Sequence, residues 1–171
     1  MDFVTIATTI GLSSLIATVV SGFITSRNSK KEREFSLQKE EYYNLQQKAE
    51  HIFGYMYQYD QRLNMMFGQL ESHMISLQDL NKGELELNKY RQQIYEVIHV
   101  YFWDKSNEYN EYSKAMANLM DIYFDVAYKQ NMTKEDVDKL GQYEPEFQKN
   151  QFKFTEAILG KIQQYRDKLN K

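Results

Sequence analysis

Residues 42–80 read YYNLQQKAEHIFGYMYQYDQRLNMMFGQLESHMISLQDL, and this stretch decides the fold. Its apolar residues recur at alternating steps of three and four, a spacing that keeps one stripe on one face of a helix. The residues between them are mostly Gln, Glu, Lys, Asn and Arg, which suit a solvated face. The pattern predicts a long helix with a packed seam at Tyr42, Leu45, Ala49, Ile52, Met56, Tyr59, Leu63, Met66, Leu70, His73, Leu77 and Leu80.

A second apolar stripe begins directly after residues 81–83, where the sequence Asn-Lys-Gly is typical of a helix end. If the chain reverses there, facing residues have numbers that sum to about 164, so that Ile94 faces Leu70. This register predicts an antiparallel, coiled-coil-like hairpin with a kink or a break at Asp104–Asn107. The second stripe comprises Leu85, Leu87, Tyr90, Ile94, Val97, Tyr101, Tyr109, Tyr112, Met116, Leu119 and Tyr123.

A third helical region covers the remaining apolar surface of the hairpin. Thr133 and Asp136 have the spacing of a capping box, and Pro145 suits the first turn of a helix. The fold class is therefore all-α, with helices at about 30–80, 84–129, 134–142 (short) and 145–170. The last of these carries an apolar stripe at Phe147, Gln151, Phe154, Ile158, Ile162, Tyr165 and Leu169.

The N-terminal segment differs from the rest of the chain in charge. Phe3–Thr25 has no charged residue, and as a helix it spans roughly 34 Å, enough to cross a bilayer core of about 30 Å. The positive charges follow this segment instead of preceding it, which disfavours a cleaved signal peptide. We predict two regions, a transmembrane anchor over residues 1–26 and a helical bundle over residues 27–171.

The flanking charges predict the orientation of the anchor. Arg27, Lys30, Lys31 and Arg33 directly follow the segment, whereas no Lys or Arg precedes it. The positive-inside rule then predicts a single-pass protein of the cell membrane. Its N-terminus lies outside the cell and its bundle lies in the cytoplasm. The same residues could contact anionic lipid headgroups. The lack of Cys is compatible with a reducing compartment.

Small residues form a stripe along the predicted anchor, at steps of three and four. Such a stripe lets two helix backbones approach closely and predicts self-association or docking on another membrane helix. In the alternative interpretation, the hydroxyls bond to carbonyls of their own helix and only lower the hydrophobicity. The stripe consists of Ala7, Gly11, Ser14, Thr18, Ser21 and Thr25.

Few features of the sequence point to chemistry. The chain has 171 residues, a net charge of −3 and no Cys, so thiolate metal sites and cysteine nucleophiles are excluded, and nothing favours a nucleic-acid partner. Phosphate-binding, nucleophile-elbow and zinc-protease motifs are absent. Glu96 and His99 match half of a di-iron motif, but no second copy exists. We expect no enzyme activity, no metal, no cofactor and no small-molecule substrate.

The densest aromatic group is Tyr101, Phe102 and Trp103, and it has two interpretations. Tyr and Trp favour protein interfaces, so the group could be a docking point. Alternatively, the rings fill a narrow bundle core.

The sequence favours a non-enzymatic membrane protein whose cytoplasmic bundle mediates protein–protein interaction or self-assembly. Its partners are then the membrane and either further copies of itself or an unidentified protein. The alternative function is a membrane-perturbing effector, such as a small toxin or a phage-exclusion pore, that acts by oligomerisation of its Ser/Thr-rich segment. The abundance of Lys, Asn, Ile and Tyr is typical of AT-rich bacterial or phage genomes.

Overall fold

A computed structural model describes residues 3–72, 76–129 and 133–170, with side chains from Ser26 onward except at Arg27, Glu71 and Val137. These described ranges contain helices and turns but no strand, as the all-α prediction requires. The elements are α1 (Phe3–Glu71), α2 (Leu77–Tyr101), the short 3-10 helix η1 (Trp103–Lys105), α3 (Ser106–Lys129) and α4 (Lys134–Leu169).

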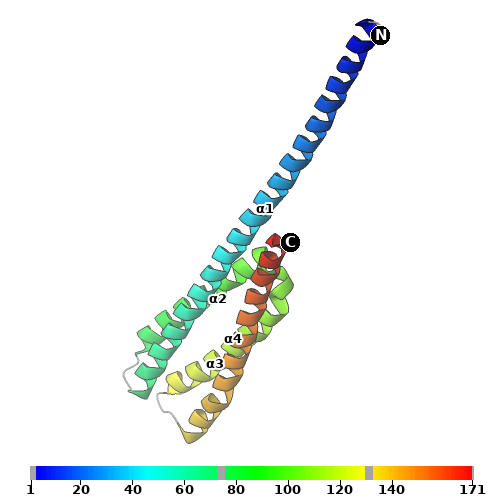
Figure 1. Cartoon of the computed structure of the whole chain (residues 1–171). Helices are drawn as coiled ribbons and strands as arrows, with labels where there is room; N and C mark the ends of the chain where they lie inside the picture. Colours follow the sequence, from blue (N-terminus) through cyan, green and yellow to red (C-terminus); the bar gives the residue numbers. More distant parts are fainter. Residues whose placement is uncertain (1–2, 73–75, 130–132, 171) are drawn as a thin grey trace.

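The four α-helices form an up-down-up-down bundle in which each helix runs antiparallel to the next (Figure 1). Helix α4 closes the ring by packing against α1. A side-chain contact joins every neighbouring pair of helices: Arg62 with Glu86, Tyr109 with Arg91, Lys153 with Glu111, and Gln151 with Asp60. The prediction of a long hairpin with one further helix is therefore wrong, because the region expected to form one helix over 84–129 folds into two.

The break between α2 and α3 lies at the residues predicted to form a kink. Phe102 leaves the helical conformation (φ −132°, ψ 32°) and its side chain is fully buried. Lys161 of α4 donates a hydrogen bond to the Tyr101 carbonyl at 2.9 Å and pairs with Asp104. These contacts satisfy polar groups that a helix end leaves free, so the chain reverses at this point instead of bending.

The first reversal also differs from its predicted position. Ser76 caps α2, and its hydroxyl accepts a hydrogen bond from the Asp79 backbone N–H at 3.1 Å. Residues 81–83 therefore lie inside α2, and the predicted boundaries of the helices at 30–80 and 84–129 are wrong. Gly83 is buried under Met66, which shows that this glycine allows close helix packing instead of ending a helix.

The shifted reversal changes the register of α1 and α2. Facing residues, such as Met66 with Gly83 and Arg62 with Glu86, have numbers that sum to about 149 instead of 164. The predicted pairing of Ile94 with Leu70 is therefore wrong. Two predicted seam residues lie on the surface instead, Leu77 with 54% and Leu85 with 72% of their area exposed.

The seam of α1 itself is confirmed over most of its length. Every predicted seam residue from Leu45 to Leu70 is buried, and Tyr42 is half-buried. His73 lies outside the described residues. The apolar stripe predicted for the last helix is confirmed as well, since Phe147, Phe154 and Ile158 are buried in the core.

Helix α4 is continuous, so the prediction of separate helices at 134–142 and 145–170 is wrong. The predicted capping box is confirmed, because Thr133 and Asp136 exchange hydrogen bonds at the first turn. Pro145 lies inside the helix on an exposed position. It removes the hydrogen bond that a residue at 145 would donate to the Gly141 carbonyl. The partly buried Leu140 and Tyr143 before it and the buried Phe147 after it hold the helix on the core.

The N-terminal part of α1 projects far beyond the other three helices (Figure 1). Residues 28–41 are exposed, and Ser26 is exposed as well. Within the part of the chain whose side chains are described, no helix is both long and apolar enough to cross a membrane. In the predicted anchor, Met1 and Asp2 lie outside the described residues, and the side chains of the stripe from Ala7 to Thr25 are not described. The side chain of Arg27, which follows the anchor, is not described either.

Two glycines test the register of α1 and α2. A Cβ at Gly83 would lie 2.6 Å from Met66 Cε, whereas a Cβ at Gly54 meets no atom within 4 Å. We expect Gly54→Ala to stabilise the protein by up to about 1 kcal/mol through helix propensity. Gly83→Ala should be less stable than Gly54→Ala by about 1 kcal/mol, because the end of the buried Met66 side chain must move aside. Chemical denaturation measures both changes, and equal stabilisation by the two variants would contradict this register.

Candidate binding groove between helices α1 and α4

A groove of about 470 Å³ lies where α1, α3 and α4 meet. Apolar side chains form much of its wall, and they come from all three helices. Helix α1 contributes them because residues beside its seam, such as Phe67, are only partly covered by the neighbouring helices. The apolar lining consists of Leu63, Phe67, Leu119, Leu140 and Phe147.

Asp60 is the principal polar group of the groove. Gln151 Nε2 donates a hydrogen bond of 2.6 Å to Asp60 Oδ2, which joins α4 to α1. The second oxygen, Oδ1, is buried and has no hydrogen-bond partner within the described part of the chain. Burial raises the pKa of the Asp60 carboxyl above its usual value, although the bond from Gln151 opposes this shift. The carboxylate thus has an unused acceptor in a region where water is largely excluded.

Two tyrosines make a polar layer in the core beside Asp60. The side chains of Tyr59 and Tyr112 are fully buried, and neither hydroxyl has a hydrogen-bond partner among the described residues. Burial raises the pKa of both phenols, and the neighbouring Asp60 carboxyl raises each of them further. Both phenols are therefore neutral at physiological pH and retain a proton that they can donate.

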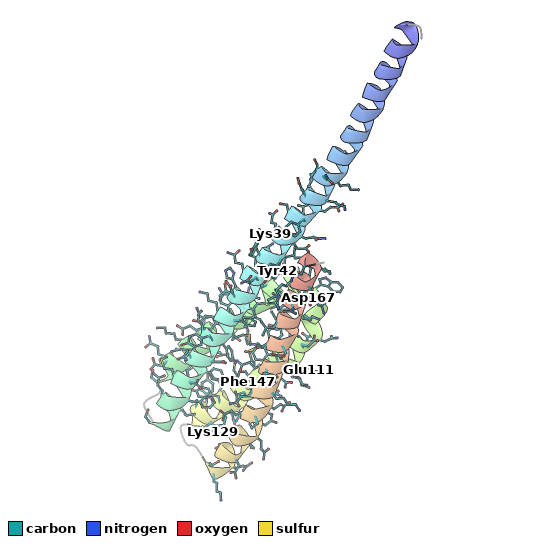
Figure 2. All side chains as sticks on the ribbon, viewed as in Figure 1. Lys39, Tyr42, Glu111, Lys129, Phe147 and Asp167 are labelled. Atoms are coloured by element: carbon teal, nitrogen blue, oxygen red, sulfur yellow. The ribbon has the colours of Figure 1, made fainter. Side chains whose placement is uncertain are left out.

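Aromatic packing holds this region in place. The Phe147 ring lies 6.4 Å from the Tyr59 ring and 5.7 Å from the Tyr112 ring. Phe154 stacks on Tyr112 at 5.4 Å with an interplanar angle of 16°. Figure 2 shows Phe147 on α4 among the crowded side chains of the bundle, whereas Lys39 lies on the projecting part of α1. Since interlocked rings resist rearrangement, the groove is formed before any ligand arrives.

The charge of the groove is negative. Its lining includes the carboxylates of Asp60 and Glu144 but no Lys, Arg or His. Glu144 accepts a hydrogen bond from the neutral Gln148 amide at 3.2 Å. No Lys or Arg forms an ion pair with Asp60 in the described ranges. The groove therefore offers acceptors and apolar walls, an arrangement that suits binding.

The residues predicted as docking aromatics are not brought together on one surface. Phe102 is buried, and the Tyr101 ring is half-buried beneath Lys48, whose Nζ lies 5.0 Å from the ring centroid. Only Trp103 is strongly exposed, with 72% of its area accessible. Phe102 thus fills the core, whereas a docking role for the exposed Trp103 stays a prediction.

The other predicted site residues lie far from the groove in the fold. Lys30, Lys31 and Arg33 are exposed on the projecting part of α1. Glu96 and His99 are exposed on α2, where the His99 ring packs against Tyr95 at 4.0 Å. Within the described ranges, no three His, Cys, Asp or Glu side chains are grouped so that they could hold a metal ion.

Sequence reasoning missed the polar residues of the groove. Asp60 follows the seam residue Tyr59 directly, and only the packing of α4 turns it from a surface residue into a groove residue. One signal was present, because Gln151 occupies a position in the apolar stripe of the last helix. A polar residue at such a position needs a buried partner, and Asp60 is that partner.

No family model, curated protein or solved structure matches this chain. The groove and its charge therefore rest on the geometry of this chain alone.

Asp60 gives a test of the groove by stability. Because its folded-state pKa lies above the usual 3.8, ionisation of Asp60 costs stability as the pH rises from that value through the folded-state pKa. We expect Asp60→Asn, which retains an acceptor for Gln151, to keep the free energy of unfolding at pH 7 within about 0.5 kcal/mol of wild type or to raise it. Asp60→Ala should lower it by about 1–3 kcal/mol because Gln151 loses its partner.

The measurement is thermal or chemical denaturation between pH 4 and pH 7. Wild type should lose stability relative to Asp60→Asn as the pH rises. Asp121→Asn, at an exposed position of α3, is the matched control and should show no such trend. A wild type that gains stability over Asp60→Asn with rising pH would show that the carboxylate is favourably paired.

Proposed function

We propose that this chain is a non-enzymatic single-pass protein of the cell membrane, with its N-terminus outside and its bundle in the cytoplasm, and that it self-assembles at the membrane. The observation that carries this proposal is the continuity of α1. One helix runs from the uncharged segment Phe3–Thr25, through an exposed stretch, into the buried core at Leu45. A single helix of this kind suits an anchor that is rigidly joined to its domain.

The exposed stretch of α1, residues 28–41, supports self-assembly. No other helix of the described chain covers it, and its Phe35 and Leu37 side chains have 52% and 57% of their area exposed. A solitary helix of this length is marginal in water, so a second helix alongside it would stabilise it.

A second copy of the chain is the partner that the sequence favours. The small-residue stripe from Ala7 to Thr25 lies on the same helix as the exposed stretch and suits close approach of two identical helices. Residues 30–41 carry charges of both signs, so two parallel copies can alternate Lys or Arg with Glu.

The orientation is testable because the chain has no natural Cys. We expect Asp2→Cys to react with a membrane-impermeant maleimide on intact cells. Asn170→Cys, an exposed position just after α4, should react only after the cells are permeabilised. The reverse labelling pattern would contradict the N-out orientation, and release of the protein from membranes by alkaline carbonate would contradict the anchor.

Self-assembly is testable by single Cys substitutions at each position from 28 to 41, in native membranes treated with a thiol oxidant. We expect disulfide-linked dimers at positions that recur about every 3.5 residues, the period of two helices packed in parallel. Adding Gly11→Leu and Thr18→Leu should reduce the yield of dimer several-fold, since bulky side chains separate the helices. Gly160→Leu, at an exposed position of α4, serves as the control.

Two results would contradict self-assembly. One is the absence of crosslinked dimer at every position of the stretch. The other is a crosslink to a different protein without any dimer, which would assign the stretch to a partner of another sequence.

The membrane-perturbing effector remains the second proposal, and the composition of the anchor supports it. The segment Phe3–Thr25 contains eight Ser or Thr residues, whose hydroxyls could line a polar path in an oligomer. Overexpression should then depolarise cells that carry a membrane-potential dye, and Gly11→Leu with Thr18→Leu should abolish this effect. Unchanged potential on overexpression of the wild type would exclude a pore.

A further inference from the structure

We propose that the groove between α1 and α4 is a binding site for a small organic cation with an apolar body, whose cationic group lies against Asp60. This inference depends only on the bundle and is separate from the proposed membrane anchor.

The size and walls of the groove suit a small organic molecule. Its volume of about 470 Å³ lies in the range of small-molecule sites, about 300–1,000 Å³. Phe67, Leu119 and Phe147 face it from three different helices. A purely polar ligand would leave this apolar surface in contact with water, so the ligand needs an apolar portion.

The polar groups of the groove call for a donor. Asp60 lines the groove with a half-buried carboxylate that no Lys or Arg of the described chain pairs with, and Glu144 adds a second, exposed carboxylate. Two carboxylates with no basic residue in the lining favour a positively charged donor.

Ligands of other charge fit less well. An anion would meet two carboxylates and no Lys, Arg or His in the lining. A neutral molecule would leave the Asp60 carboxylate without a counter-charge, since the described chain supplies none. A metal ion lacks ligands, because the described residues contain no cluster of three metal-binding side chains. An organic ammonium can pair with Asp60 and lie near the faces of Phe67 or Phe147.

The test uses the purified full chain, and calorimetry measures binding. The probes are benzylammonium, phenethylammonium and 3-phenylpropylammonium, with 2-phenylethanol and phenylacetate as the neutral and anionic counterparts of phenethylammonium. We expect at least one ammonium to bind at least tenfold more tightly than 2-phenylethanol, and phenylacetate not to bind.

Two variants locate the site, each with a matched control. Asp60→Asn should weaken binding of the ammonium at least tenfold, whereas Asp121→Asn should leave it unchanged. Gly141→Leu should also weaken binding, because the new side chain fills the groove, whereas Gly160→Leu on the same helix should not. A Cβ at either glycine meets no atom within 4 Å, so both variants should fold.

Three outcomes would overturn the proposal. The first is no binding of any of the three ammonium ions at 10 mM, an upper concentration chosen on the order of the weakest meaningful affinities. The second is equal binding of the ammonium and of 2-phenylethanol, which would remove the role of charge. The third is undiminished binding to a folded Asp60→Asn or Gly141→Leu protein, which would place the ligand elsewhere.

Discussion

The bundle depends on the buried seam of α1, because each of the other helices is positioned by a contact with it. Helix α2 approaches it closely where Gly83 packs on Met66. Helix α3 lies diagonally across the core, and the Tyr123 hydroxyl donates a hydrogen bond of 2.8 Å to the Met66 carbonyl. Helix α4 meets it through the pair of Asp60 and Gln151. A change in the α1 seam would thus alter three interfaces at once, and residues near Met66 are the most sensitive.

The sequence predicts the buried faces of this fold well but not its reversals. The stripes on α1 and α4 and the cap at Thr133 are local patterns that each helix carries by itself. A reversal is different, because a stripe that continues after a break has the same spacing in a bent helix and in two antiparallel helices. The turn at Phe102 depends on Lys161, which is distant in sequence. Gly83 is ambiguous for a similar reason, since glycine both ends helices and allows them to approach.

The sequence predicts the groove less well than it predicts the fold. Its residues come from three helices, so it exists only once the order of the helices around the bundle is known. A three-helix arrangement would have placed Asp60 on the surface, where a carboxylate needs no explanation. The polar residue in the stripe of α4, Gln151, is the one feature of the sequence that indicates a buried polar partner. The small-residue stripe and the basic residues near Lys30 concern the other end of α1 and have no part in the groove.

The continuity of α1 also fixes a phase relation between its two ends. Each helical residue turns the chain by about 100°, and the 35 residues from Thr25 to Asp60 span roughly 53 Å. Because the helix has no break, the turn of its backbone at residue 60 sets the turn of its backbone at residue 25. No loop or turn interrupts the backbone between the groove and the N-terminal segment. The groove and the N-terminal segment are thus joined through the backbone of one helix, whose length and turn fix their relative orientation.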